Sequence, residues 1–496
     1  MADGYGLSHY DDAKELYKKL NRLVDEPARI IARPAMAAYV KQLEDGCPKS
    51  QAMVAEAKKY IPGGVEHNLA FNYPFPLVID RAEGAYLYDI DGHQYIDFLQ
   101  AGGPTILGTN NPVVRKQVID LLEHSKGPTT GLFSEYELLL AKEINRHMPA
   151  CEMFRMLGSG TESCMAAIRV ARLATGKKYV IKMGGAYHGW SDQLVYSLHV
   201  PNTRTYEAHG IPHKCTHFTK EASSKSLESL ERALRLNQLR GGTAAVMVEP
   251  VGPESGTRPV EKNYNKGVRE LCDKYGALLI FDEVVTGFRL GLGGAQGYFG
   301  VKPDLTTFGK IVAGGYPSAG GLGGRRDLIM LMAAGLESGK KRAYVGGTLA
   351  ANPLSAAAGY FAIKEIERTK ACEVAGRAGD RLVSGLNKKI DELGLPFVCY
   401  NQGSICHLET VGTMFFDLDI LHIKRFLTET KVRKHYMEEY GAAYSAEGIV
   451  TLAGSRMYTS AADTDDVIDD AIGRFARVFK NVDPNPAPVP GKNGKD

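Results

Sequence analysis

The sequence lacks long apolar runs, paired cysteines and a strong excess of charge of either sign. No stretch approaches the roughly 18 uninterrupted apolar residues that indicate a membrane-spanning helix. Its eight cysteines form no CxxC or CxxH pair, which favours reduced thiols in a reducing compartment over a disulfide framework. A formal net charge of +3 on 496 residues gives no electrostatic reason to expect nucleic acid or an anionic membrane as a partner.

Nucleotide-binding signatures are missing as well. Neither GxGxxG nor GxxxxGK[ST] occurs in the chain, which argues against nicotinamide, flavin and nucleoside triphosphate sites. His188 has no second candidate ligand at the spacing of known metal motifs, so no metal site is expected. Residues 1–6 have neither the basic flank nor the apolar run of a signal peptide, and we expect a cytoplasmic protein.

The order of apolar and polar segments predicts an α/β protein with a large and a smaller domain. Strand and helix patterns alternate between residues 133 and 282, which predicts a mainly parallel sheet with helices on both faces. A turn at Asp91-Gly92 predicts a β-hairpin over 83–98. The predicted parts are an N-terminal helical extension (1–49), the first part of a small domain (50–110), a large domain (111–365), the C-terminal α+β part of the small domain (366–480) and a mobile tail (481–496).

The most informative stretch covers residues 277–325. Residues 277–281 form a short apolar run, typical of a strand buried on both faces, and Asp282 follows at its carboxyl end, where open α/β sheets bind ligands. Lys310 lies in a glycine-rich segment with little charge nearby, and desolvation of such an amine makes it a nucleophile. These are the two protein groups that a pyridoxal phosphate (PLP) site requires, although each alone is more often a surface or turn residue.

Three further segments add candidate contacts for such a cofactor. The loop at 158–161 connects a predicted strand to a predicted helix and offers small residues and hydroxyls to a phosphate, or else a simple helix N-cap. Tyr187 follows another predicted strand and is either a stacking aromatic or a core residue beside a hydrogen-bonded His188. The segment 346–348 is either a second phosphate contact or an ordinary loop before a helix.

Six motifs occur in order along the chain. They are Ser-Gly-Thr-Glu (159–162), Tyr-His-Gly (187–189), Val-Glu-Pro (248–250), Asp-Glu-Val-Val-Thr-Gly-Phe-Arg (282–289), a long segment ending in Phe-Gly-Lys (293–310) and Gly-Gly-Thr (346–348). With these motifs, roughly residues 50–480 closely resemble the class-III PLP-dependent aminotransferases. Within that family, the resemblance is to the branch of the glutamate-1-semialdehyde 2,1-aminomutases.

The resemblance implies the fold of the type I PLP-dependent transferases and a homodimer with active sites at the subunit interface. It implies that Lys310 forms a Schiff base with PLP and moves the substrate proton, while Asp282 holds the pyridinium nitrogen. Val284 and Tyr187 would pack on opposite faces of the ring. The remaining implied cofactor contacts are Ser159, Gly160, Thr161, Glu254 at the position of a family asparagine, and Thr348 from the neighbouring subunit.

The sequence departs from the aminomutases near the substrate. No arginine occurs between Pro62 and Asp80, where the aminomutases carry one for the substrate carboxylate. This favours an aminotransferase that moves an amino group from an amine or a β- or ω-amino acid, including β-aminoacyl thioesters, to a keto acid such as 2-oxoglutarate or pyruvate by a ping-pong mechanism. An intramolecular aminomutase, an amino-acid racemase or epimerase, and a non-catalytic binding protein are the alternatives.

Three residues are candidates for substrate contacts. Arg289 and Arg456 could each hold the carboxylate of the amino acceptor, or could instead form structural ion pairs. Trp190, the single tryptophan, could line the substrate pocket or pack in the core.

Overall fold

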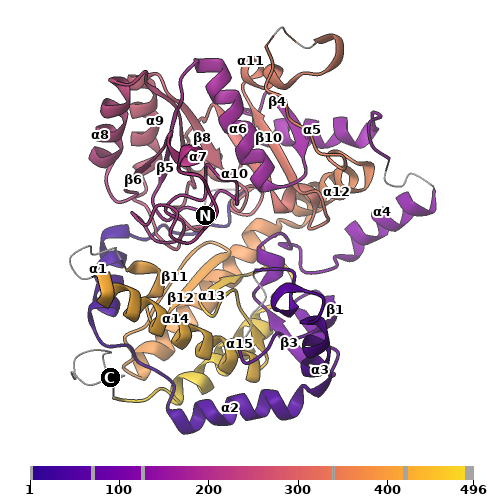
Figure 1. The fold of residues 1–496 in the computed structure, drawn as a ribbon. Coiled ribbons are helices and arrows are strands. Elements are labelled where there is room, and N and C mark those ends of the chain that lie inside the picture. The colour runs from indigo at the N-terminus through magenta and orange to yellow at the C-terminus, as the bar shows by residue number, and fades with distance from the viewer. Residues whose placement is uncertain are drawn as a thin grey trace. The chain divides into compact units, whose positions relative to one another are not determined.

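The computed structural model describes residues 4–68, 73–124, 129–337, 339, 341–416 and 423–485, with the backbone alone over 423–427. The chain divides into two compact units (Figure 1). The first unit combines Met1–Ala13 with Pro112–Glu373, and the second combines Lys14–Asn111 with Val374–Asp496.

The first unit is built on a seven-stranded sheet. Its strands are β4 (Met153–Leu157), β5 (Tyr179–Met183), β6 (Thr219–Ala222), β7 (Thr243–Val248), β8 (Leu278–Asp282), β9 (Leu305–Gly309) and β10 (Gly320–Gly324), in the spatial order β4-β10-β9-β8-β7-β5-β6. Strand β10 is antiparallel to both of its neighbours, and the other pairs are parallel. The predicted α/β fold with a mainly parallel sheet is therefore confirmed.

Helices cover both faces of this sheet because consecutive strand residues point to opposite sides. Met247 and Ile280 pack in the cluster that includes residues of α6 (Gly160–Thr175). Val246 and Phe281 pack on the other face with residues of α8 (Leu227–Gln238) and α9 (Tyr264–Tyr275). The remaining helices of this unit are α4 (Pro112–Glu123), α5 (Glu135–His147), α7 (His213–Thr216), α10 (Gly294–Phe299), α11 (Arg326–Ile329) and α12 (Pro353–Thr369).

The second unit contains two smaller sheets. One has the order β1-β2-β3-β13, with β1 (Ile79–Glu83), β2 (Tyr86–Asp89), β3 (Gln94–Asp97) and β13 (Ile449–Val450). The other has the order β11-β12-β14, with β11 (Val398–Gln402), β12 (Ile405–Glu409) and β14 (Arg456–Tyr458). Strands β2 and β3 pair antiparallel around the predicted turn, with Tyr86 opposite Ile96, so the predicted hairpin is confirmed.

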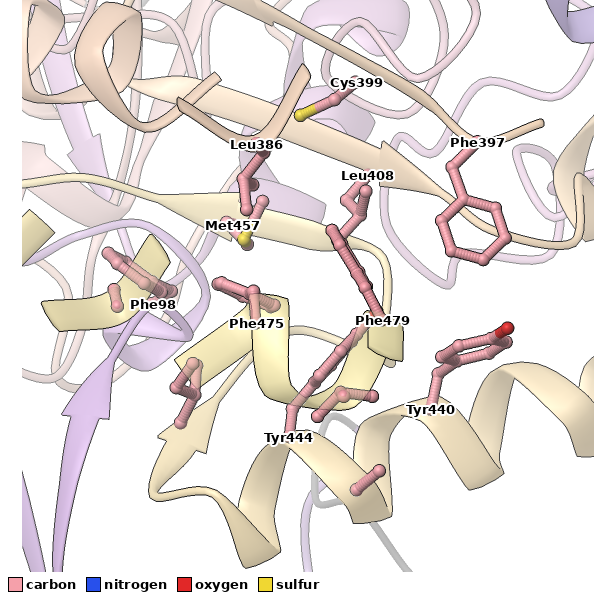
Figure 2. Packing of buried hydrophobic residues seen from close by; sticks show 14 of the residues in the cluster. Phe98, Leu386, Phe397, Cys399, Leu408, Tyr440, Tyr444, Met457, Phe475 and Phe479 are labelled. Atoms are coloured by element: carbon pink, nitrogen blue, oxygen red, sulfur yellow. The ribbon is translucent and has the colours of Figure 1, made fainter. Parts of the chain in front are cut away.

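Segments from both ends of the sequence share one core in this unit (Figure 2). Phe98, which follows β3, stacks on Phe475 of α15 (Asp465–Lys480) with ring centroids 6.4 Å apart. Phe475 also meets Tyr444 of α14 (Ile423–Ala446) at 4.8 Å. This shared core is why residues before 111 and after 374 form a single unit. Helices α2 (Arg33–Gly46), α3 (Pro48–Ala57) and α13 (Ala371–Glu392) complete the helices of this part.

The amino-terminal helix α1 (Ala13–Asp25) is packed through its leucines and hydrogen-bonded at its carboxyl end. Its buried leucines Leu16, Leu20 and Leu23 cluster with Tyr400 and Phe415. Across the described residues, none of the helices is both long enough and apolar enough to cross a membrane.

Arg433 of α14 closes the carboxyl end of α1. The residue is 6 % exposed, and its guanidinium donates to the carbonyl oxygens of Leu23, Val24, Glu26 and Val411 over 2.8–3.0 Å. Because the last carbonyls of a helix have no partner within the helix, this side chain replaces the missing donors. We expect Arg433→Met to lower the free energy of unfolding by about 2–4 kcal/mol, since buried carbonyls lose their donors.

Equilibrium urea denaturation followed by circular dichroism measures this loss. Arg22→Met is the matched control, because Arg22 is exposed and its nearest carboxylate, on Glu26, lies 3.9 Å away. That variant should stay within about 0.5 kcal/mol of wild type. An equal, small effect of both substitutions would show that the four carbonyls do not depend on Arg433.

Candidate active site

Four neighbouring strands of the large sheet end in polar residues at the same edge. Lys310 follows β9, Asp282 ends β8, Glu249 follows β7, and the Tyr187-His188 segment follows β5. These strands lie in the order β9-β8-β7-β5 and run parallel, so their carboxyl ends meet at one edge. Such an edge is where open α/β sheets bind ligands.

The carboxylate of Asp282 is buried and fixed by several donors. His188 Nδ1 lies 2.6 Å from Asp282 Oδ2. The same oxygen accepts a hydrogen bond from the Cys164 thiol over 3.5 Å. The hydroxyl of Thr307 and the backbone N–H of Val284 both donate to Oδ1 over 3.1 Å. The thiol contact is long and weak, so Oδ2 keeps the capacity to accept one further, stronger hydrogen bond.

His188 is completely buried behind Asp282. Burial lowers the pKa of this imidazole and outweighs the opposing effect of the Asp282 carboxylate. Since a carboxylate only accepts, Nδ1 carries the proton and donates it to Asp282, as the tautomer must be inferred from the partner. The other nitrogen, Nε2, is buried and has no hydrogen-bond partner within the described residues. Sequence reasoning left His188 without a role, and only its place after a strand pointed to the site.

The neighbouring acid, Glu283, turns to the opposite side of the strand. Its carboxylate accepts from the backbone N–H groups of Ala295 and Gln296 at 2.7 and 3.0 Å and from the Thr286 hydroxyl at 3.0 Å. Glu283 thus fixes the amino end of α10, and burial raises its pKa. Of the two acids in the Asp-Glu motif, Asp282 alone contacts His188.

Lys310 adopts a strained backbone conformation directly after β9. Its φ is +50°, in the left-handed region that residues other than glycine rarely occupy.

Val284 lies close to the backbone at two glycines of the candidate site, Gly160 and Gly309. A Cβ at Gly160 would lie 2.9 Å from a Val284 methyl group, and one at Gly309 would lie 2.8 Å from the other. Glycine at these two positions therefore lets Val284 approach the backbone.

The loop before α6 has the form of an anion site. Ser159 is the N-cap of this 16-residue helix, and its hydroxyl accepts from the Glu162 N–H at 3.2 Å. Gly189 has φ of +86°, and a Cβ there would lie 2.7 Å from Thr161 Cα, so only glycine lets the Tyr187-His188 segment approach the first turn. The amino ends of helices favour negative charge.

Glu249, which belongs to the Val-Glu-Pro motif but was assigned no role from the sequence, links two of the loops at this edge. Its carboxylate accepts from the backbone N–H groups of Tyr187 at 3.0 Å, Glu254 at 2.9 Å and Ser255 at 2.6 Å. Burial, together with the nearby Glu254 and Asp282 carboxylates, raises the pKa of Glu249. Its signal in the sequence is a single acid between the apolar run 244–248 and a proline.

The ring of Tyr187 is 45 % exposed and stacks on His199, with centroids 6.5 Å apart and planes 15° from parallel. His199 Nε2 lies 3.3 Å from the carboxylate of Glu254. The backbone N–H of Tyr187 is held by Glu249, and the ring is partly exposed. Tyr187 is therefore suited to stack on a flat ligand.

Lys182 anchors the segment that carries Tyr187 and His188. It lies in β5 and is completely buried, and its ammonium donates to the carbonyls of Ala186 and Tyr196, both over 2.7 Å. Burial lowers its pKa to about 8. A charged residue inside an otherwise apolar strand is the signal that sequence reasoning did not use.

The remaining predicted residues are more dispersed. Trp190 is 76 % exposed, which excludes the core-packing alternative within this chain. Arg289 is completely buried in the first unit, and Arg456 lies in β14 of the second. Thr348 lies in an exposed loop whose Gly347 is close to Glu162, since a Cβ there would lie 3.3 Å from its carboxylate. The substrate roles of these residues and the sharing of Thr348 between subunits stay predictions.

These residues fit PLP. A helix amino terminus with Ser159 and Thr161 suits a phosphate, and the buried Asp282 oxygen suits a protonated ring nitrogen. Lys310 stands at the end of the strand next to the one that carries Asp282.

Comparison with known proteins identifies the family. Residues 70–425 match the family model of class-III aminotransferases. A glutamate-1-semialdehyde 2,1-aminomutase of Lachnoclostridium phytofermentans is 40 % identical over 374 residues, which cover 74 % of this chain and 84 % of that protein.

Solved structures agree with this result. An ω-transaminase from Sphaerobacter thermophilus is 26 % identical with a TM-score of 0.77, covering 87 % of this chain and 97 % of its own. A β-phenylalanine aminotransferase from Variovorax paradoxus is also 26 % identical, with a TM-score of 0.76 and coverage of 90 % and 97 %. The predicted resemblance is confirmed: the chain belongs to the class-III aminotransferases, which are PLP-dependent enzymes.

Proposed function

We propose that this enzyme transfers an amino group from an amine or a β- or ω-amino acid to a keto acid by a ping-pong mechanism. The observation that carries the proposal is the absence of any arginine between Pro62 and Asp80, the stretch in which the aminomutase branch holds its substrate carboxylate. Residues 69–72 of this stretch lie outside the described residues. The similarity to an ω-transaminase and to an aminotransferase of a β-amino acid supports the same substrate class.

The residues at the sheet edge divide the chemistry among them. PLP, when bound, supplies an electron sink for the pair left when the substrate carbon that bears the amino group loses its proton. The Lys310 amine would hold the cofactor aldehyde and would serve as the base that takes the proton from the substrate carbon. Asp282 would accept a hydrogen bond from the ring nitrogen and keep it protonated, and His188 holds that carboxylate in place over 2.6 Å.

The other contacts position the cofactor. Ser159, Gly160 and Thr161 offer hydroxyls and the amino end of α6 to the phosphate. Tyr187 and Val284 would contact opposite faces of the ring. The Glu249 carboxylate accepts from the backbone N–H groups of both Tyr187 and Glu254, which places Glu254 close to Tyr187.

We further propose a homodimer in which Thr348 of one subunit completes the phosphate site of the other. Large apolar side chains that are strongly exposed in a single chain support an interface. They include Leu132, Phe133, Trp190, Tyr344 and Leu349.

The 40 % identity to an aminomutase keeps intramolecular amino transfer as the second candidate. Single-substrate assays separate the two functions. An aminotransferase given only the amino donor stops after one half-reaction, because the amino group stays on the enzyme until a keto acid arrives. An aminomutase or a racemase turns over many times without any acceptor.

The experiment adds amines, β-amino acids and ω-amino acids one at a time to the purified holoenzyme and records absorbance and product, with and without 2-oxoglutarate or pyruvate. We expect one donor class to change the spectrum once and to give sustained product only with an acceptor. Sustained turnover of glutamate-1-semialdehyde or of one amino-acid enantiomer without an acceptor would reject the aminotransferase proposal.

A further inference from the structure

A second group of chemically active side chains lies in the other unit, at the junction of α2 and α3. Cys47 separates these two helices, and its thiol faces the β2–β3 hairpin. Cys47 Sγ lies 3.8 Å from both Asp89 Oδ2 and His93 Nδ1, and these two atoms lie 3.0 Å apart. Cys47 and Asp89 are buried, whereas the side chain of His93 is 46 % exposed.

These separations are close to the distances between ligand atoms in a tetrahedral metal site. An ion bound at the usual Zn–S, Zn–N and Zn–O lengths holds its ligand atoms about 3.3 to 3.6 Å apart. The observed 3.8, 3.8 and 3.0 Å differ from those values by only a few tenths of an ångström. A sulfur, an imidazole nitrogen and a carboxylate oxygen are also the donors that zinc-like ions select.

The ligand atoms are oriented by a second set of contacts. Asp89 Oδ1 accepts from the backbone N–H groups of Asp91 and His93 at 3.0 and 2.8 Å, which leaves Oδ2 directed at Cys47 and His93. The Tyr95 hydroxyl donates to Oδ2 over 2.8 Å. Outer contacts of this kind fix the direction of metal ligands.

The hairpin and the helix junction are also fastened to one another next to the cluster. Asp91 accepts from the backbone N–H groups of Lys49 and Ser50 at 2.8 and 3.0 Å and from the Ser50 hydroxyl at 2.7 Å. The first turn of α3 is thereby held against the hairpin turn, and the donors are held together before any ion arrives.

The same atoms do not form a nucleophilic triad. In such a triad the thiol and the acid contact different imidazole nitrogens, so that the ring passes a proton between them. Here both Cys47 and Asp89 lie nearest to Nδ1 of His93. The three atoms Cys47 Sγ, Asp89 Oδ2 and His93 Nδ1 instead lie around one common point, as the ligand atoms of a metal site do.

We propose that Cys47, Asp89 and His93 bind a divalent transition-metal ion of the zinc type, with water as the fourth ligand. Binding replaces the thiol proton by the metal and releases that proton to solvent, while the ring proton of His93 moves from Nδ1 to Nε2 so that Nδ1 can serve as a ligand. The Cys47 thiolate and the Asp89 carboxylate then balance the two charges of the ion, which a largely buried site requires. The half-exposed edge of His93 gives water access to the fourth position. The sequence did not predict this site because Cys47 and Asp89 are separated by 42 residues.

The test uses Co²⁺ as a spectroscopic substitute for zinc in the holoenzyme, after treatment with a chelator. Tetrahedral Co²⁺ absorbs at the red end of the visible spectrum, where the PLP chromophore does not interfere. We expect one tightly bound ion per chain, displaced by Zn²⁺, and loss of the band in Cys47→Ser. Cys399→Ser, which changes another buried thiol of the same unit, should keep the band.

His93→Gln removes a ligand from a half-exposed side chain and leaves the fold intact, so it tests the site even if Cys47→Ser unfolds. We expect this variant to bind Co²⁺ at least about tenfold more weakly. Absence of the band in the wild-type protein, or an equal band in Cys47→Ser and in His93→Gln, would reject the metal site and leave the cluster as a hydrogen-bond network. Aminotransferase assays on the same samples report separately on the first unit.

Discussion

Lys310→Ala should yield a folded protein whose turnover is at least about three orders of magnitude below that of wild type. If the proposed roles hold, the substitution removes both the amine that binds the cofactor aldehyde and the group that moves the substrate proton. The backbone cost should not change, because alanine at φ of +50° is strained as lysine is. The fold should therefore persist, and the phosphate loop should still hold PLP without a covalent link.

The measurement combines steady-state turnover with the visible absorption of the enzyme-bound cofactor. Lys302→Ala is the matched control, because Lys302 is an exposed lysine in the segment directly before β9. It should keep both the spectrum and the rate. A small added amine should partly restore proton transfer in Lys310→Ala, because it replaces the missing base. Wild-type turnover in Lys310→Ala without such rescue would remove Lys310 from the proposed chemistry.

The strand ends that form the site could be predicted from sequence because they rest on local patterns. A fully apolar pentapeptide before Asp282 predicts a buried strand, and the strand's end predicts the position of the acid at the sheet edge. The motif contains two adjacent acids, however, and periodicity alone does not say which one serves the site. The structure separates them through their donors, with His188 on Asp282 and the start of α10 on Glu283.

Other parts could not be predicted, because they depend on contacts between distant segments. Strand β10 consists of four glycines and Leu322, so no β-propensity marks it. Its glycines serve close packing, since a Cβ at Gly320 would lie 2.3 Å from the Ser159 carbonyl oxygen. Glu249 reaches Tyr187 across 62 residues and His188 reaches Asp282 across 94. A single sequence contains no pattern that pairs such positions.

Asp282→Asn should lower the rate by about two to four orders of magnitude while leaving the fold and the Lys310–cofactor linkage in place. Asparagine has the same shape as aspartate, and its carbonyl oxygen can still accept from Thr307 and Val284. Its amide group would face His188, whose Nδ1 must then accept, which moves the ring proton to the buried Nε2. More importantly, an amide does not hold the ring nitrogen protonated, so the electron sink weakens.

Glu283→Gln is the matched control for this prediction, because it makes the same chemical change at the adjacent residue. Its carboxylate accepts from Ala295, Gln296 and Thr286, so replacing it should lower stability by about 1–3 kcal/mol. The turnover of each folded molecule should remain near wild type. Thermal denaturation should therefore show a loss of stability only in Glu283→Gln, and single-turnover kinetics should show a loss of rate only in Asp282→Asn.

If Asp282→Asn were as fast as wild type, or if Glu283→Gln lost turnover without losing stability, the assignment of Asp282 as the acid that acts on the cofactor would have to be abandoned. Slow turnover in Asp282→Asn, together with lower stability but normal turnover in Glu283→Gln, would assign the chemical role to Asp282, which contacts His188, and the structural role to Glu283.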